Sequence, residues 1–81
     1  RRAIAYYEQC LLLHREIGDR RGEGNALFNM SLVLNELGER AQAIQLASAT
    51  LAIFAQIEDP HTDMVREQLA AWQAAQAETE K

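Results

Sequence analysis

Apolar residues lie three and four positions apart through most of this chain, which is the spacing of an amphipathic helix. Three breaks interrupt the pattern, at Gly18, Gly38 and Pro60. Glycine adopts the left-handed conformation that closes a helix, and proline lacks the amide that a helix interior uses. The pattern therefore predicts four helices in a single domain 1–81, at about 1–17, 23–37, 40–57 and 62–78.

The connections between these segments are short. Residues 19–24 combine charge with two glycines, Gly22 and Gly24, and have no apolar residue, so we expect a connection there with the helix restarting by Asn25. Only two residues, 39 and 40, separate Gly38 from the next apolar run, which favours an antiparallel hairpin. Thr62 or Asp63 is expected to cap the fourth helix.

Part of the chain repeats after 40 residues. Ala3-Ile4 recurs as Ala43-Ile44, and the same offset relates Leu11 to Leu51, Ile17 to Ile57 and Asp19 to Asp59. A period of this size is typical of stacked helical hairpins. The sequence therefore predicts an all-α fold of antiparallel helical hairpins.

With this period, the chain resembles the tetratricopeptide repeat family in its long variety. The resemblance covers nearly the whole chain. The positions that match the family in order are Leu27, Met30-Ser31, Leu34, Gly38, Ala43, Ala47 and Thr50. The resemblance implies a right-handed superhelix with helices in the order B-A-B-A, at the C-terminal end of an array. Ser31, Ala47 and Thr50 depart from the residues usual in the family, which concerns packing detail.

The resemblance also implies a function. A helices of the family line a concave surface, and the residues carried over to helix 23–37 are Asn25, Phe28, Asn29, Leu32, Asn35 and Glu36. We expect them to hold a peptide or helix of a protein partner through side-chain amides and two apolar groups. The alternative, from a similarity of residues 51–72 to repeats of large bacterial signalling proteins, is a regulatory sensor segment of a signalling ATPase or effector.

Composition narrows the partners. Twelve acidic and eight basic residues give a net charge of −4, which disfavours nucleic acid. The longest apolar run, 10–13, is far too short for a membrane span. A single cysteine indicates a reducing compartment, so we expect a cytoplasmic protein. The chain begins at Arg1 within a helical pattern and is interpreted as an excerpt, so we expect Tyr6, Leu12 or Leu13 to be exposed and the chain to self-associate.

No catalytic, cofactor or metal site is predicted. Cys10 is interpreted as a packed residue, and His14 and His61 as surface residues too isolated to bind zinc. The carboxylates Asp19, Glu23, Glu36 and Glu39 flank glycine turns, where acids are solvated or cap helices. Gly18, Gly22 and Gly24 form no phosphate loop and are interpreted as helix breaks. Trp72 either closes the end of the stack, which is favoured, or anchors a partner.

Overall fold

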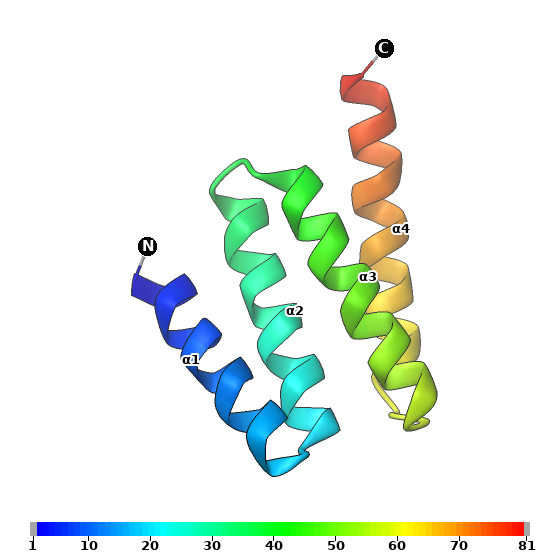
Figure 1. The fold of residues 1–81 in the computed structure, drawn as a ribbon. Helices are drawn as coiled ribbons and strands as arrows, with labels where there is room; N and C mark the ends of the chain where they lie inside the picture. Colours follow the sequence, from blue (N-terminus) through cyan, green and yellow to red (C-terminus); the bar gives the residue numbers. More distant parts are fainter. Residues whose placement is uncertain (1, 81) are drawn as a thin grey trace.

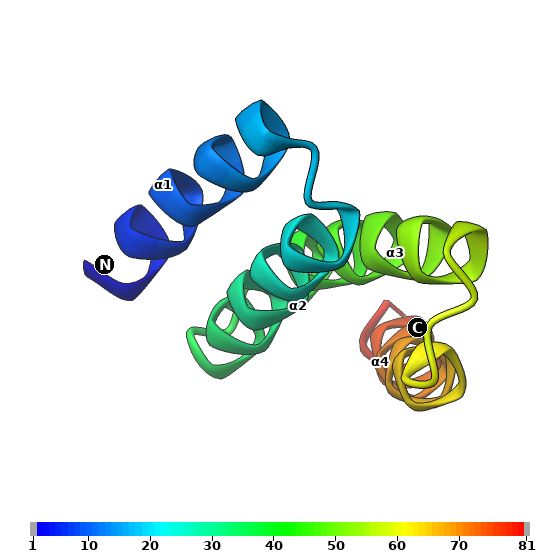
Figure 2. The same cartoon turned by 90° about the horizontal axis from the view of Figure 1, so that it is seen from below.

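Four antiparallel helices form the computed structural model, which describes residues 2–80 (Figure 1). They are α1 (Arg2–Ile17), α2 (Arg20–Glu36), α3 (Arg40–Gln56) and α4 (Thr62–Thr79). Each helix packs against the next one in the chain, so that α1 and α4 lie at the two ends of the row. Figure 2 shows that α1 and α4 leave the layer of α2 and α3 on opposite sides. The predicted all-α hairpin fold is confirmed.

Three of the predicted helices agree with the structure to within a residue at the ends that it describes; Arg1 lies outside the described residues. The second helix was predicted too short, because α2 begins at Arg20 and residues 20–24 are helical. The Asp19 carboxylate accepts a hydrogen bond from the Gly22 amide at 2.9 Å and caps the helix. Because Asp19 caps α2 directly after Gly18, the predicted connection over residues 19–24 does not form.

Gly22 and Gly24 lie inside α2 and are not helix breaks. A side chain at Gly24 would collide with the Phe54 ring of α3, and one at Gly22 would collide with His14 of α1. The carbonyl of Gly24 also accepts a hydrogen bond from the Thr50 hydroxyl of α3, at 3.3 Å. These glycines therefore allow the neighbouring helices to approach the backbone of α2.

The first three helices end in the same way. Gly18, Gly38 and Glu58 have φ angles of 72°, 83° and 55°, so a left-handed residue recurs every 20 positions. After α1, the Gly18 amide donates to the Arg15 carbonyl at 3.3 Å and the Asp19 amide to the His14 carbonyl at 2.8 Å. The same pair of bonds follows α2 and α3. The breaks predicted at Gly18 and Gly38 are confirmed.

The fourth helix is not capped by Thr62 or Asp63, as the sequence had suggested. Thr62 is the first residue of α4, and its hydroxyl donates back to the Asp59 carbonyl at 2.6 Å. The Asp59 carboxylate instead accepts from the His61 amide at 2.8 Å. The acidic residue before Pro60 therefore organises this connection, because its side chain can reach across the turn.

Two apolar clusters form the core. The first joins all four helices through residues that include Leu11, Leu27, Phe54 and Val65. The second consists of Leu34, Ala43, Ala47, Leu69 and Trp72. The Trp72 residue is 7% exposed and packs in this cluster with residues of α2 and α3, as expected for a residue that closes the stack. The small alanines of α3 let the large ring approach.

Candidate interaction surfaces

The six residues predicted to bind a partner lie along one face of α2, which we call the α2 stripe (Asn25, Phe28, Asn29, Leu32, Asn35 and Glu36). Three of them are exposed, namely Asn25, Leu32 and Glu36, and the others are half-buried. The opposite face carries the buried residues Ala26, Leu27, Met30 and Leu34. The stripe thus presents amides and an acid, with Leu32 the exposed apolar side chain and the half-buried Phe28 packed against the core.

The α2 stripe borders two hollows. Asn25 and Asn29 help to line a hollow of about 450 Å³ between α1 and α2, whose other walls include Tyr6, Cys10 and His14. At the far end, Asn35 lines a second hollow together with the α2–α3 turn and Gln76 of α4. Polar side chains at both ends of the stripe therefore face open space rather than packed protein.

A second candidate surface lies on α1, which exposes large apolar side chains on more than one side. Tyr6, Leu12, Leu13 and Ile17 are 62%, 60%, 56% and 66% exposed. The predicted exposure of Tyr6, Leu12 and Leu13 is confirmed. Because the core takes up mainly Leu11 and partly Ile4 and Tyr7, the remaining large apolar side chains of this helix face outward.

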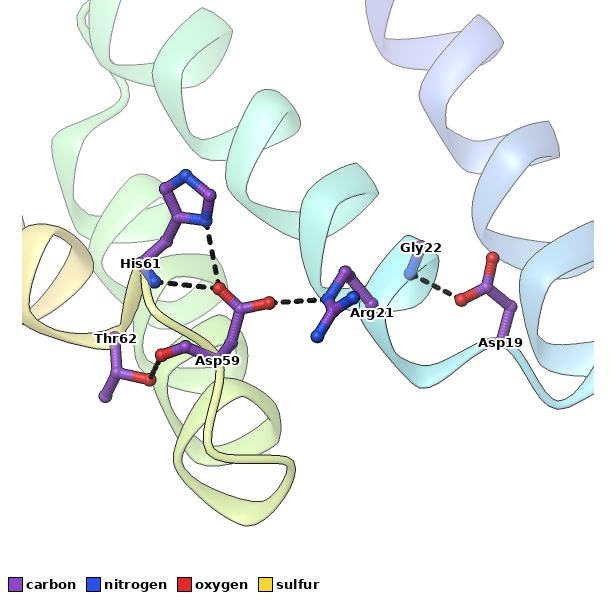
Figure 3. Close-up of polar contacts among 6 residues, drawn as sticks. All are labelled: Asp19, Arg21, Gly22, Asp59, His61 and Thr62. Carbon is purple, nitrogen blue, oxygen red and sulfur yellow. Dashed lines mark hydrogen bonds and ion pairs between the residues drawn. The ribbon is translucent and has the colours of Figure 1, made fainter.

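In the connection between α3 and α4, the Asp59 carboxylate is contacted by Arg21 and His61 (Figure 3). The Asp59 side chain is 1% exposed, and its Oδ2 accepts from Arg21 Nε of α2 at 2.7 Å. Its Oδ1 accepts from the His61 amide and lies 3.0 Å from His61 Nδ1. The His61 amide and the Arg21 guanidinium lower the pKa of Asp59, although burial opposes this shift. This connection is thereby fixed to the start of α2.

Glu23 is buried and not solvated, contrary to the prediction for the acids near glycines. Its carboxylate accepts from Arg15 Nε of α1 at 3.1 Å and from an Arg20 guanidinium nitrogen at 3.0 Å. Arg20 also donates to Gln56 of α3 at 2.6 Å. This network therefore joins α1, α2 and α3 through hydrogen-bonded side chains.

The histidines differ from each other. His61 is exposed, as predicted, but the His14 side chain is only 29% exposed and its Nδ1 lies 3.2 Å from Asp19 Oδ2. The spacing of Cys10 and His14, four positions apart on a helix, is the signal that places both beside the hollow. Among residues 2–80, no group of three or more His, Cys, Asp or Glu side chains is placed to hold a metal ion.

Scans against models of known protein families, against curated proteins and against solved structures find no match to this chain. In the described part of the chain, no helix is long and apolar enough to cross a membrane. Its four antiparallel helices place the molecule among the all-α proteins built from helical hairpins.

Proposed function

We propose that this chain is a protein-interaction module of the tetratricopeptide-repeat kind, which binds a peptide or helix of another protein along the α2 stripe. The observation that carries the proposal is the division of α2 into two faces. One face is buried in the core, and the other holds three amide side chains beside Leu32 and open hollows. Amides of this kind both donate and accept, so they bond to the backbone of a peptide without demanding a particular sequence.

The stripe also favours a partner without strong negative charge. Glu36 is the charged residue of the stripe, and the whole chain has a net charge of −4. An apolar side chain of the partner, placed on Leu32 and Phe28, would contribute most of the affinity. A neutral hydrogen bond to the partner contributes less, because it only replaces a hydrogen bond that the same groups make to water. A neutral or basic peptide with one large apolar residue is therefore the expected ligand.

A selection from a library of displayed random peptides against the chain tests this function. The best peptide is then titrated against Leu32→Asp and Asn35→Ala, and against Leu37→Asp as a matched control, because Leu37 is also an exposed leucine but lies outside the stripe. We expect Leu32→Asp to weaken binding by about tenfold or more, Asn35→Ala to weaken it by about two- to fivefold, and the control to change it little. Equal affinities for all variants, or failure to select any peptide, would contradict the proposal.

A further inference from the structure

The outer face of α1 carries an apolar seam with a regular spacing. Its residues are Ala3, Tyr6, Cys10, Leu13 and Ile17, which we call the α1 seam. The intervals of three, four, three and four residues are those by which one helix packs along another. Along this seam Tyr6, Leu13 and Ile17 are more than half exposed. The α1 seam is thus built like a helix–helix interface and has no helix on it among the described residues.

The same seam occurs once more, and there it is covered. Forty residues later the equivalent positions, which we call the α3 seam, are Ala43, Leu46, Thr50, Ile53 and Ile57. All five are buried or half-buried. The helix that covers them is α2: Thr50 bonds to the Gly24 carbonyl, Ile53 shares a cluster with Leu27, and Ala43 shares one with Leu34. The molecule itself shows what kind of element fits such a seam.

The aspartates that follow the two seams also differ in burial: the one after the covered α3 seam is buried, and the one after the open α1 seam is partly exposed. Asp59 stands two residues after the α3 seam, and its buried carboxylate is paired with Arg21 of the covering helix at 2.7 Å. Asp19 stands at the equivalent place, two residues after the α1 seam. Its amide donates to the His14 carbonyl as the Asp59 amide donates to the Phe54 carbonyl, but its side chain, which caps α2, is 43% exposed. A helix lying on the α1 seam as α2 lies on the α3 seam would bring a basic residue to Asp19.

We infer that the α1 seam is a binding site for one more helix, supplied by a partner protein and running antiparallel to α1. Its recognition pattern follows from the covering face of α2. The partner helix carries a basic residue for Asp19, a glycine or other small residue three positions later opposite Cys10 and His14, and leucines three and ten positions after that (compare Arg21, Gly24, Leu27 and Leu34). Such a helix would also fill the hollow of about 450 Å³, because Tyr6 and Cys10 line both the hollow and the seam.

This inference does not rest on the proposed function, because it is argued from the residues of α1. The α1 seam and the α2 stripe border the same hollow at Asn25 and Asn29, so Asn35, which lines another hollow at the far end of the stripe, is used to separate them. The probe is a synthetic, fluorescein-labelled peptide with the sequence of residues 20–37, since α2 is the helix known to fit an equivalent seam. It is titrated against the whole chain and followed by fluorescence anisotropy. Leu13→Gln lies on the seam, and Leu12→Gln is the matched control, because Leu12 is its neighbour with nearly equal exposure on another side of α1.

We expect saturable binding that Leu13→Gln weakens by about tenfold or more and Leu12→Gln by less than about twofold. A peptide with leucine in place of Gly24 should also lose affinity by about tenfold. Asn35→Ala of the α2 stripe should leave this titration unchanged, so failure here is distinct from failure of the proposed function. No binding up to about 1 mM peptide, equal effects of the two leucine variants, or a homodimer through Leu13 that excludes the peptide would each overturn the inference.

Discussion

The start of α2 is held from two sides by equivalent pieces of the chain, and the two sides differ in burial. On one side are His14 of α1 and Asp19 of the connection that follows it. On the other side, 40 residues later, are Phe54 of α3 and Asp59 of its connection. The backbone hydrogen bonds are the same on both sides to within 0.1 Å. Phe54 is 2% exposed and the Asp59 side chain 1%, whereas the side chains of His14 and Asp19 are 29% and 43% exposed.

The difference shows how one backbone arrangement serves both the interior and the edge of a stack. Where a helix covers the position, the chain uses an aromatic ring and a buried ion pair. Where the position is open, it uses an imidazole and a half-exposed carboxylate that water can solvate. The variants below probe this contrast through the stability of the chain.

The largest expected effect is at Gly24. Gly24→Ala should lower the free energy of unfolding by about 2 kcal/mol, because the new methyl group would collide with the Phe54 ring, which is 2% exposed and packed in the core. Gly22→Ala should change it by less than about 1 kcal/mol, since His14 and Asp19 can shift outward and alanine favours the helix. Urea unfolding followed by circular dichroism measures both, and equal losses would refute the contrast.

Asp59 should make the stability of the chain depend on pH. The pKa of Asp59 is lowered from its ordinary value of 3.8 in the folded chain, so its ionised form adds stability above that value. This contribution is lost as the pH falls through the lower, folded pKa. The stability difference between the wild type and Asp59→Asn should therefore be largest near neutral pH and shrink below about pH 4.

Asp19→Asn serves as the control for this titration, because asparagine keeps the helix cap while removing the charge. Urea unfolding of the three proteins between pH 7 and pH 2.5 gives the profiles. A constant gap between the wild type and Asp59→Asn would show that the Arg21 pair contributes no more than a surface contact.

The smallest effects concern the left-handed residues. Glu58→Gly should raise the free energy of unfolding by about 0.5 to 1 kcal/mol, because glycine adopts the φ of 55° without strain. Gly18→Ala should lower it by about 1 kcal/mol at the equivalent position. Thermal unfolding resolves both changes, and a loss of stability in Glu58→Gly would indicate that the Glu58 side chain makes a contact worth more than the strain.

The helices, their order and the period of 40 were predictable because apolar spacing and glycine breaks are local signals. The Arg21–Asp59 pair was not, since its members are 38 residues apart and meet only once α2 packs on the end of α3. The one related signal in the sequence is that Asp59 repeats Asp19 after 40 residues, which marks Asp59 but not its partner Arg21. Gly22 and Gly24 were misread because a glycine can serve either a break or a close contact, and only the neighbouring helix decides.

The candidate surfaces also differ in how far the sequence alone predicts them. Exposure of Tyr6 and Leu13 follows from counting which residues of α1 the core takes up. The α2 stripe comes from a resemblance, and the structure adds where each residue lies; its ligand stays a prediction. The α1 seam needed both sources, because its spacing is visible in the sequence but only the packing of α2 on α3 shows what such a seam accepts.

Helices α1 and α3 occupy equivalent places in the fold, and they differ in that the α3 seam is covered by α2 whereas the α1 seam is open. Native-state hydrogen exchange of individual amides tests this difference directly, because protection reports how firmly each helix is held. We expect amides of residues 43–54 in α3 to exchange at least about tenfold more slowly than their equivalents, residues 3–14 in α1. Equal protection of the two helices would contradict the account.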